Sequence, residues 1–264
     1  MLIDSVIIVL REALEAALLI SVLLAAARRL ALPRPRFGLG VGLGILGAGI
    51  FAASLRRISD WFEGAGYELA NSTLQLLIYA AILVIIGLLG SGRDPRRPAA
   101  TLPWAMVAAV SLAIIREGSE ILLYFGSFMQ QIGATTDALT GAALGLGVGF
   151  SAGALFYYLL VALPPAGILP VAAGLLALIG AGMCAQAARL LVQVDWLPAQ
   201  PPLWDTSTWL PEQSPLGQLL YALLGYEATP SPLQAALYLA CIALAAGVAL
   251  GARFPVRREG PVHD

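Results

Sequence analysis

The sequence predicts an all-α, polytopic membrane protein of seven transmembrane helices, built as an inverted repeat of three plus three helices followed by one C-terminal helix. Three observations carry this prediction. Hydrophobic residues make up 59% of the 264 residues and charged residues only 12%, whereas a soluble domain carries about 25% charged residues. Seven apolar segments are long enough to cross a bilayer, which takes about 20 residues. One charged motif also occurs twice along the chain.

The seven apolar segments are separated by gaps in which proline and arginine gather. They are predicted at residues 2–27, 37–55, 69–89, 102–129, 139–163, 168–194 and 233–251. A longer stretch, residues 195–232, holds three tryptophans and many prolines and is not expected to span the membrane. Within it, residues 216–226 are predicted to form a short helix at the membrane interface, the depth that Trp and Tyr favour.

The distribution of arginine predicts the orientation. All fifteen basic residues are arginines, and none lies in the long loop. Cytoplasmic loops of membrane proteins carry an excess of basic residues. We therefore expect a multi-pass protein of the cytoplasmic (inner) membrane, with the N-terminus and the loop at 195–232 outside and the tail at 252–264 in the cytoplasm. The ten arginines assigned to the inside are Arg28, Arg29, Arg34, Arg36, Arg93, Arg96, Arg97, Arg253, Arg257 and Arg258, against Arg56 and Arg57 outside.

An internal repeat relates the two halves of the chain. The motif Arg11-Glu12-x-x-Glu15 recurs as Arg116-Glu117-x-x-Glu120, 105 residues later. The same offset aligns two glycine-rich stretches, residues 39–44 and 144–149. Three segments, an odd number, separate the copies, so the halves must run in opposite directions through the membrane. We expect one transmembrane domain over residues 1–264, with repeat one at about 1–100, repeat two at about 101–195 and the seventh segment outside the repeat.

Small residues recur every four positions in the second and fifth segments, where they allow helices to approach closely. They are Gly40, Gly44 and Ala48, with Gly145, Gly149 and Gly153 as their counterparts. Packing within one protomer is the preferred interpretation, and a seam between copies of a homo-oligomer is the alternative.

The two charged motifs lie near the middle of their segments and carry the chemistry. Residues three apart on a helix share a face, as Glu12 and Glu15 do. A charge at mid-membrane costs roughly 3 kcal/mol, so these groups must point into the bundle. Four carboxylates against the counter-charges of Arg11 and Arg116 leave a net −2 if all are ionised, which favours a cation site. A purely structural ion-pair network is the alternative, but buried ion pairs are weak stabilisers.

The donor types narrow the cation to a class. Carboxylate oxygens suit hard ions such as magnesium, calcium, manganese or ferric iron. The only histidine is His263, and Cys184 and Cys241 lie in apolar runs away from both motifs. A carboxylate di-iron enzyme normally uses Glu-x-x-His pairs, and a serine hydrolase needs histidine. We therefore expect a transporter and not an enzyme, with no organic cofactor and no nucleic-acid partner.

The paired motifs, in the first and fourth of seven segments, resemble those of the oxidase-dependent high-affinity iron permeases, especially the bacterial EfeU type. The loop is similar too, in Asp205-Thr206-Ser207, Leu210-Pro211, Gly225-Tyr226 and Pro230-Ser231. The resemblance covers nearly the whole chain. It implies iron uptake, with ferric iron favoured, an extracytoplasmic oxidase or iron-binding protein as donor, and iron ligands at Glu12, Glu15, Glu117 and Glu120. A transporter of another hard divalent cation, such as manganese or magnesium, is the alternative.

Acidic residues outside the motifs are candidates for the entrance. Family members often have a glutamate-rich stretch after the second segment, and this chain has only Glu63 and Glu68 there. The long loop is acidic and lacks basic residues, so it could concentrate cations through Asp205 and Glu212. Arg189, near the end of the sixth segment, is expected to pair with an acid such as Asp195 or to reach the interface.

Overall fold

The structure, a computed structural model, describes residues 2–32, 35–90, 100–128 and 135–252. These residues form eight α-helices and one short 3-10 helix, and no strand occurs among them. The elements in order are α1 (Leu2–Arg29), α2 (Pro35–Ser59), η1 (Trp61–Gly64), α3 (Gly66–Gly90), α4 (Leu102–Phe128), α5 (Thr135–Val161), α6 (Pro165–Gln193), α7 (Pro215–Leu224) and α8 (Pro232–Gly251).

The prediction of an all-helical polytopic membrane protein is confirmed for the described residues. Five helices there are long and apolar enough to cross a membrane, at Arg36–Leu55, Gly66–Gly90, Thr136–Val161, Pro165–Gln193 and Pro232–Gly251. α1 and α4 are of similar length, 28 and 27 residues, but carry the charged motifs. Seven of the ten arginines that predict the orientation lie outside the described residues, as do His263 and nearly all of the predicted tail: Arg34, Arg93, Arg96, Arg97, Arg253, Arg257 and Arg258.

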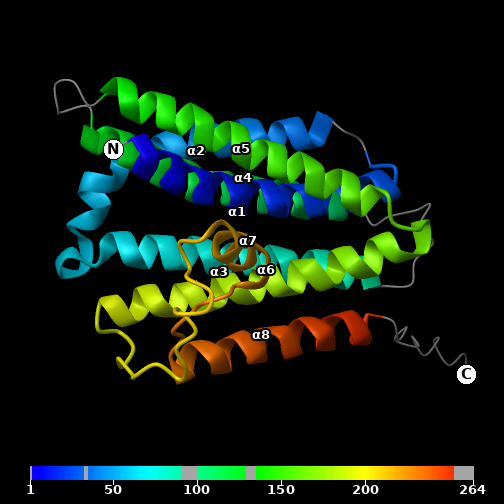
Figure 1. Ribbon diagram of the computed structural model, residues 1–264. Helices are drawn as coiled ribbons and strands as arrows, with labels where there is room; N and C mark the ends of the chain where they lie inside the picture. Colours follow the sequence, from blue (N-terminus) through cyan, green and yellow to red (C-terminus); the bar gives the residue numbers. More distant parts are fainter. Residues whose placement is uncertain (1, 33–34, 91–99, 129–134, 253–264) are drawn as a thin grey trace, which may run out of the picture.

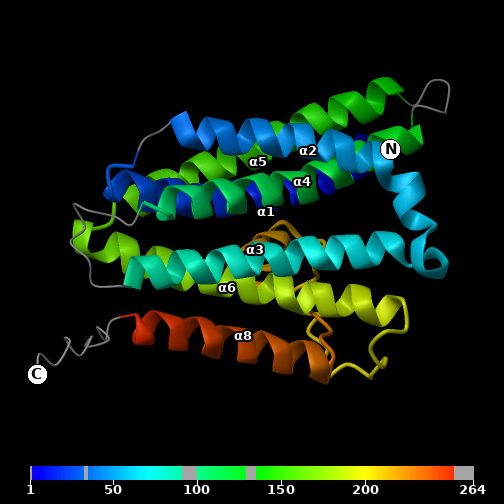
Figure 2. The same ribbon diagram turned by 180° about the vertical axis from the view of Figure 1, so that it is seen from behind.

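The helices form two groups that lie one above the other (Figures 1 and 2). One group contains α1, α2, α4 and α5, and the other contains α3, α6 and α8. The most extensive contacts join α1 to α5, α2 to α4 and α3 to α6. α1 and α4 also contact the second group, through α6 and α3 respectively. The residues of the two motifs therefore lie where the two groups meet.

Small residues set the closest helix contacts. A Cβ added to Gly149 of α5 would lie 2.6 Å from the Cβ of Ala13 on α1, and one added to Gly44 of α2 would lie 2.6 Å from the Cβ of Ile114 on α4. Hydrogen bonds reinforce both contacts, from Ser21 Oγ to the carbonyl of Gly153 (2.7 Å) and from Ser111 Oγ to the carbonyl of Gly40 (3.0 Å). The small-residue stripes thus pack within the protomer, as preferred from the sequence.

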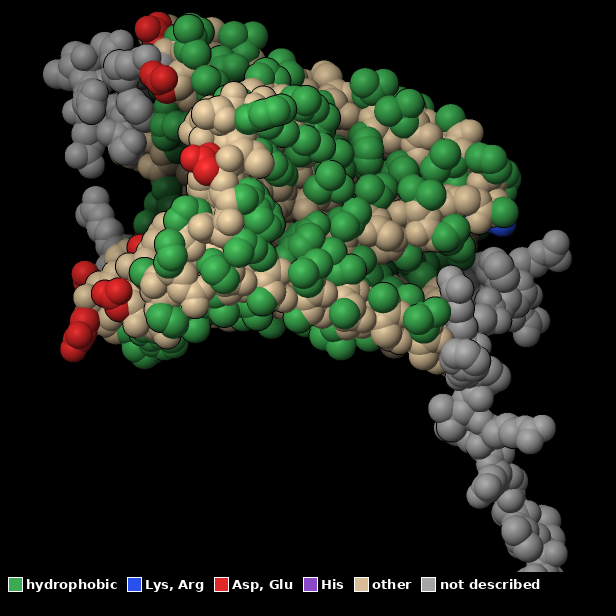
Figure 3. All heavy atoms as spheres, turned by 60° about the horizontal axis from the view of Figure 1, so that its bottom comes forward, with side chains coloured by type: hydrophobic (Ala, Val, Ile, Leu, Met, Phe, Trp, Pro, Cys, Tyr) green, Lys and Arg blue, Asp and Glu red, His purple; other side chains and the backbone are tan. Residues whose placement is uncertain are grey.

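The surface of the bundle is apolar along most of its length. Leu46 of α2, Leu155 of α5 and Leu239 of α8 are each more than 60% exposed, which is the pattern of lipid-facing helices. Figure 3 shows hydrophobic side chains spread over the face that carries α8, with Asp and Glu side chains gathered at one end.

α7 is the short helix predicted within the long loop. Ser214 caps its first turn by accepting from the Gly217 N–H, and Gly225 ends it in the left-handed conformation. Its Ala222 packs with Leu14 and Leu18, which lie in the middle of α1. α7 therefore covers the middle of α1.

Candidate metal site

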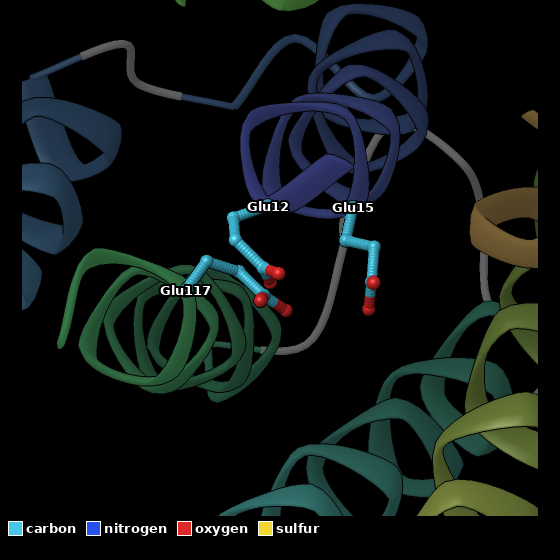
Figure 4. A group of neighbouring side chains, drawn as sticks. All are labelled: Glu12, Glu15 and Glu117. Atoms are coloured by element: carbon cyan, nitrogen blue, oxygen red, sulfur yellow. The ribbon is translucent and has the colours of Figure 1, made fainter. Parts of the chain in front are cut away.

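Three glutamates from the two motifs meet between α1 and α4. One carboxylate oxygen each from Glu12, Glu15 and Glu117 lies within 4.8 Å of the others. Figure 4 shows the side chains of Glu12 and Glu15 extending from α1 and that of Glu117 from α4, with all three carboxylates directed into the space between the helices. The three residues are between 2% and 4% exposed. Residues more than a hundred positions apart in the sequence therefore form one buried acidic cluster.

Arg116 is the main counter-charge of this cluster. Its side chain is 3% exposed, and its guanidinium donates to Glu15 Oε2 across the helix interface at 2.8 Å and also to Glu117 Oε1. Its Nε lies 3.9 Å from Glu120 Oε1, the partner expected from helical spacing. Arg116 therefore lies closer to Glu15 of the other motif than to Glu120, because helical spacing alone says nothing about a neighbouring helix.

Arg11 holds the equivalent position in the first motif but is bound more loosely. Its Nε lies 3.6 Å from Glu12 Oε1 and 3.6 Å from Glu15 Oε1, beyond the usual hydrogen-bond range. Its side chain is 40% exposed. The two motif arginines are therefore not interchangeable in this structure.

Glu120 lies beside the cluster and not within it. Its Oε1 accepts a hydrogen bond from Asn71 Nδ2 at 2.7 Å, and its side chain is 20% exposed. The structure thus brings together three of the four predicted ligands and places the fourth one helical turn from Glu117.

Uncharged polar residues of α3 and α6 complete the surroundings, and sequence reasoning missed them. Asn71 Oδ1 and Gln186 Oε1 accept from Arg116 at 3.3 and 3.1 Å, and Gln75 Nε2 donates to Gln186 Oε1 at 3.1 Å. All three residues are buried. Their signal was present as amides within otherwise apolar segments, where polar side chains are costly and often functional.

The acidic cluster retains unused acceptors. Glu12 Oε2, Glu15 Oε1 and Glu117 Oε2 are buried and have no hydrogen-bond partner. A buried polar atom without a partner costs about 1–3 kcal/mol, and more when charged. A hard cation would satisfy all three oxygens at once, because carboxylate oxygens are its preferred ligands. The arrangement can therefore hold a multivalent cation.

The predicted entrance residues lie on three separate elements. Glu63 is exposed in η1, and Glu68 lies in the first turn of α3 with one buried, unpartnered oxygen. Asp205 is exposed, and hydrogen bonds from Ser207 hold its pKa below the usual value. Glu212 Oε1 accepts from the Ala228 N–H at 2.7 Å. Asp205 and Glu212 therefore also have local roles in shaping the loop.

Arg189 pairs with Glu227 and not with Asp195, which corrects the sequence-based expectation. The two side chains approach to 3.4 Å, and Gln234 Nε2 donates to the other oxygen of Glu227 at 2.8 Å. Burial raises the pKa of Glu227, and Arg189 opposes that rise. Arg189 also donates to the hydroxyl of Tyr221 on α7 at 3.0 Å. The reason for the difference is that α7 and the chain after it fold back over α6.

Comparison with known proteins gives a consistent result. Residues 97–253, more than half of the chain, match the family described as "Iron permease FTR1 family". The chain is 26% identical over 249 residues to the "Ferrous iron permease EfeU" of Yersinia pestis, covering 88% of this chain and 87% of that protein. It is also 26% identical over 247 residues to the protein of the same name from Escherichia coli O6:K15:H31, covering 88% and 89%. No solved structure matches the chain.

Proposed function

Because the chain belongs to the iron permease FTR1 family, we propose that it carries iron across the cytoplasmic membrane through the cluster of Glu12, Glu15 and Glu117. The observation that carries this proposal is the meeting of one oxygen from each carboxylate within 4.8 Å, from two motifs and in a buried place. Iron is the transported substrate. Glu120, one turn away and hydrogen-bonded to Asn71, is the ligand that passes the ion into or out of the cluster.

The proposed ion at the cluster is ferric iron. Hard carboxylate oxygens favour the ferric ion over softer cations. The relatives from Yersinia pestis and Escherichia coli are named for ferrous iron, so both oxidation states belong in the test. Manganese and magnesium, which share the preference for oxygen ligands, are the competing substrates.

Uptake into proteoliposomes tests the proposal. The purified protein is expected to take up iron in preference to manganese and magnesium, and Glu117→Gln to abolish uptake, because it removes a charge from the centre of the cluster. Asp60→Asn, which neutralises an exposed acid in the turn before η1, is the matched control and is expected to transport normally. Equal uptake of manganese, or full iron uptake by Glu117→Gln, would refute the proposal.

The proposed topology has seven spans, with α1 and α4 crossing the membrane beside the five apolar helices. The helix contacts support an inverted repeat of α1–α3 and α4–α6. In such a repeat α1, α2 and α3 correspond to α4, α5 and α6. The α1–α5 contact then corresponds to the α4–α2 contact, and the α3–α6 contact corresponds to itself. These are the three most extensive helix contacts. In such proteins the substrate lies at the repeat interface near mid-membrane, as this cluster would.

The two proposed halves are not in the same register, which supports transport by rocking. Gly40 lies beside Val110, and Gly145, its counterpart at an offset of 105, lies beside Val9. An exact repeat would place Gly145 beside Ser5, since 110 − 105 = 5. The difference is four residues, or about one helical turn of 5.4 Å. Exchange of the two registers would open the cluster first to one side of the membrane and then to the other.

The proposed outer side carries the N-terminus, η1 and the loop between α6 and α7. The acidic end in Figure 3 supports this, together with Arg28 and Arg29 at the opposite end of α1. A cysteine placed at position 205, with the native Cys184 and Cys241 replaced, is expected to react with an impermeant thiol reagent from outside. Labelling only from the cytoplasmic side would reverse the topology.

The loop and the start of α3 form the proposed entrance, through Glu63, Glu68, Asp205 and Glu212, and receive iron from an extracytoplasmic oxidase or iron-binding protein. Asp205→Asn with Glu212→Gln removes two charges but keeps the acceptor oxygens that bind Ser207 and Ala228. Uptake is therefore expected to slow at limiting iron and to recover at high iron. Unchanged uptake at limiting iron would remove these two acids from the pathway.

A further inference from the structure

Tyr221 of α7 lies between two guanidinium groups. The Cζ of Arg11 is 5.0 Å from the centre of the Tyr221 ring, and that of Arg189 is 5.9 Å from it. Arg189 also donates to the Tyr221 hydroxyl at 3.0 Å. The tyrosine is only 6% exposed. A cation over the face of an aromatic ring is attracted to it, so the ring of Tyr221 attracts Arg11.

Tyr221 is held in this place by contacts that do not involve Arg11. Ala222 packs against Leu14 and Leu18 of α1. At the end of α7, the backbones of Gly225 and Gly182 approach so closely that a Cβ on Gly225 would lie 2.4 Å from the Cα of Gly182. The position of α7, and with it that of Tyr221, is therefore set independently of Arg11.

Arg11 is held only loosely by the carboxylates of its own motif. Its Nε lies 3.6 Å from both Glu12 and Glu15 and has no hydrogen-bond partner. Glu12 Oε2 and Glu15 Oε1 are also without one. Arg116, which has no aromatic contact of this kind among the described residues, approaches Glu15 to 2.8 Å. A guanidinium free to move would close to that distance and form charge-assisted hydrogen bonds.

We propose that Tyr221 is a positioning residue that keeps Arg11 from closing on Glu12 and Glu15, and so leaves these carboxylates open to the transported cation. Arg11 then neutralises the cluster when no cation is present without blocking it. The inference rests on the proposed function, because it assigns the cation to that same cluster. It adds α7, the short helix of the long loop, to the elements that set the affinity for iron.

Iron binding to the purified full-length protein tests this through four proteins: wild type, Tyr221→Leu, Arg11→Gln and the double variant. Tyr221→Leu is expected to weaken the apparent affinity by about twofold to about thirtyfold, the range that corresponds to a cation–π contact. In the Arg11→Gln background the same change is expected to alter affinity by less than about twofold. Tyr221→Phe keeps the ring face and is expected to recover most of the loss.

The matched control for the packing of α7 is Leu223→Ala, since Leu223 also packs on the cluster of Leu14 and Leu18. It is expected to leave the affinity within about twofold of wild type. Equal losses from Tyr221→Leu with and without Arg11 would assign Tyr221 a packing role and overturn the inference. No loss from Tyr221→Leu would overturn it as well.

Thermal unfolding of the same four proteins without iron separates this inference from the proposed function. The four proteins form a double-mutant cycle. The effects of the two substitutions on thermal stability are expected to be non-additive whether or not iron is the substrate. Absence of coupling overturns the inference alone. Failure of the wild-type protein to bind iron, or iron binding by Glu117→Gln equal to wild type, overturns the proposed function.

Discussion

Arg11 and Arg116 occupy the same position of the same motif but differ in burial and in their ion pairs. Arg116 is 3% exposed and donates to carboxylates of both motifs, whereas the Arg11 side chain is 40% exposed and stands 3.6 Å from its partners. Removing one member of a buried ion pair leaves the other charge without compensation, which costs more than the pair itself contributes. The two arginines should therefore differ in stability experiments.

Arg116→Leu is expected to lower the free energy of unfolding by about 3–5 kcal/mol, because Glu15 and Glu117 lose their closest cation. Arg11→Leu is expected to lower it by less than about 1 kcal/mol, since its ion pairs are long and partly exposed. Denaturant unfolding in detergent micelles measures both. Equal losses would mean that burial does not govern the strength of these pairs.

Glu120 offers a second test at the level of single residues. Because it lies outside the group of three and is bound to Asn71, Glu120→Gln is expected to retain iron binding with an affinity within about tenfold of wild type while the rate of uptake falls. Glu117→Gln is expected to lose both. The measurement is equilibrium binding beside initial uptake rates, and a loss of binding in Glu120→Gln equal to that in Glu117→Gln would place Glu120 inside the cluster.

Much of this site was predictable from sequence, and the missing part has a common cause. The spacing of Glu12 and Glu15, and the cost of charge at mid-span, predicted that they point inward as a group. The partner of Arg116 on α1, the amides of Asn71 and Gln186, and the pairing of Arg189 with Glu227 were not predicted. Those contacts depend on which helix lies beside which and how each is rotated, and spacing within one helix carries neither.

At the level of elements, glycines decide how close the helices lie. Length and hydrophobicity were enough to predict the seven long helices, and their observed bounds differ from the predicted ones by only a few residues. They were not enough to place α7, whose position follows from the shape of the surface on α1 and α6 that it covers. Close packing also makes α1 and α5 a single unit, because Gly149 and Gly153 leave no room between α5 and Ala13 or Ala17 of α1.

Two glycines of α5 provide a matched pair of variants. Gly149→Ala is expected to lower the free energy of unfolding by about 1–3 kcal/mol, since the new Cβ would lie 2.6 Å from that of Ala13. Gly147→Ala meets nothing within 4 Å and is expected to be neutral or to stabilise by up to about 1 kcal/mol through helix propensity. Unfolding in micelles measures both, and similar effects of the two changes would show that α5 does not pack as described.

At the scale of the whole molecule, the register difference between the α1–α5 and α2–α4 contacts predicts two alternating states. Spin labels at Leu39 and Ala108 report on the distance between α2 and α4. Labels at Leu144 and Ile3, the positions related to them by an offset of 105, report on the distance between α5 and α1. All four positions are exposed. In the present register the first pair is closer, because Gly40 lies beside Val110 whereas Gly145 lies beside Val9.

Dipolar spectroscopy in proteoliposomes, with Cys184 and Cys241 replaced, measures both separations. Iron is expected to shift the two distances in opposite directions, with the second pair becoming the closer one in the alternate state. Movement of both pairs in the same direction would argue for a change other than exchange between the halves.

The place of α7 has a consequence for how the protein is made. Its ten residues are about half of what a stable span requires, so α7 cannot insert into lipid as a span of its own. Its docking surface combines α1 and α6 and is complete only after most of the chain has been synthesised. The newly made chain must therefore pass through a stage in which Leu14 and Leu18 lack their cover, and docking of α7 is the step that ends its maturation. Until then the loop at residues 195–232 is open to proteases.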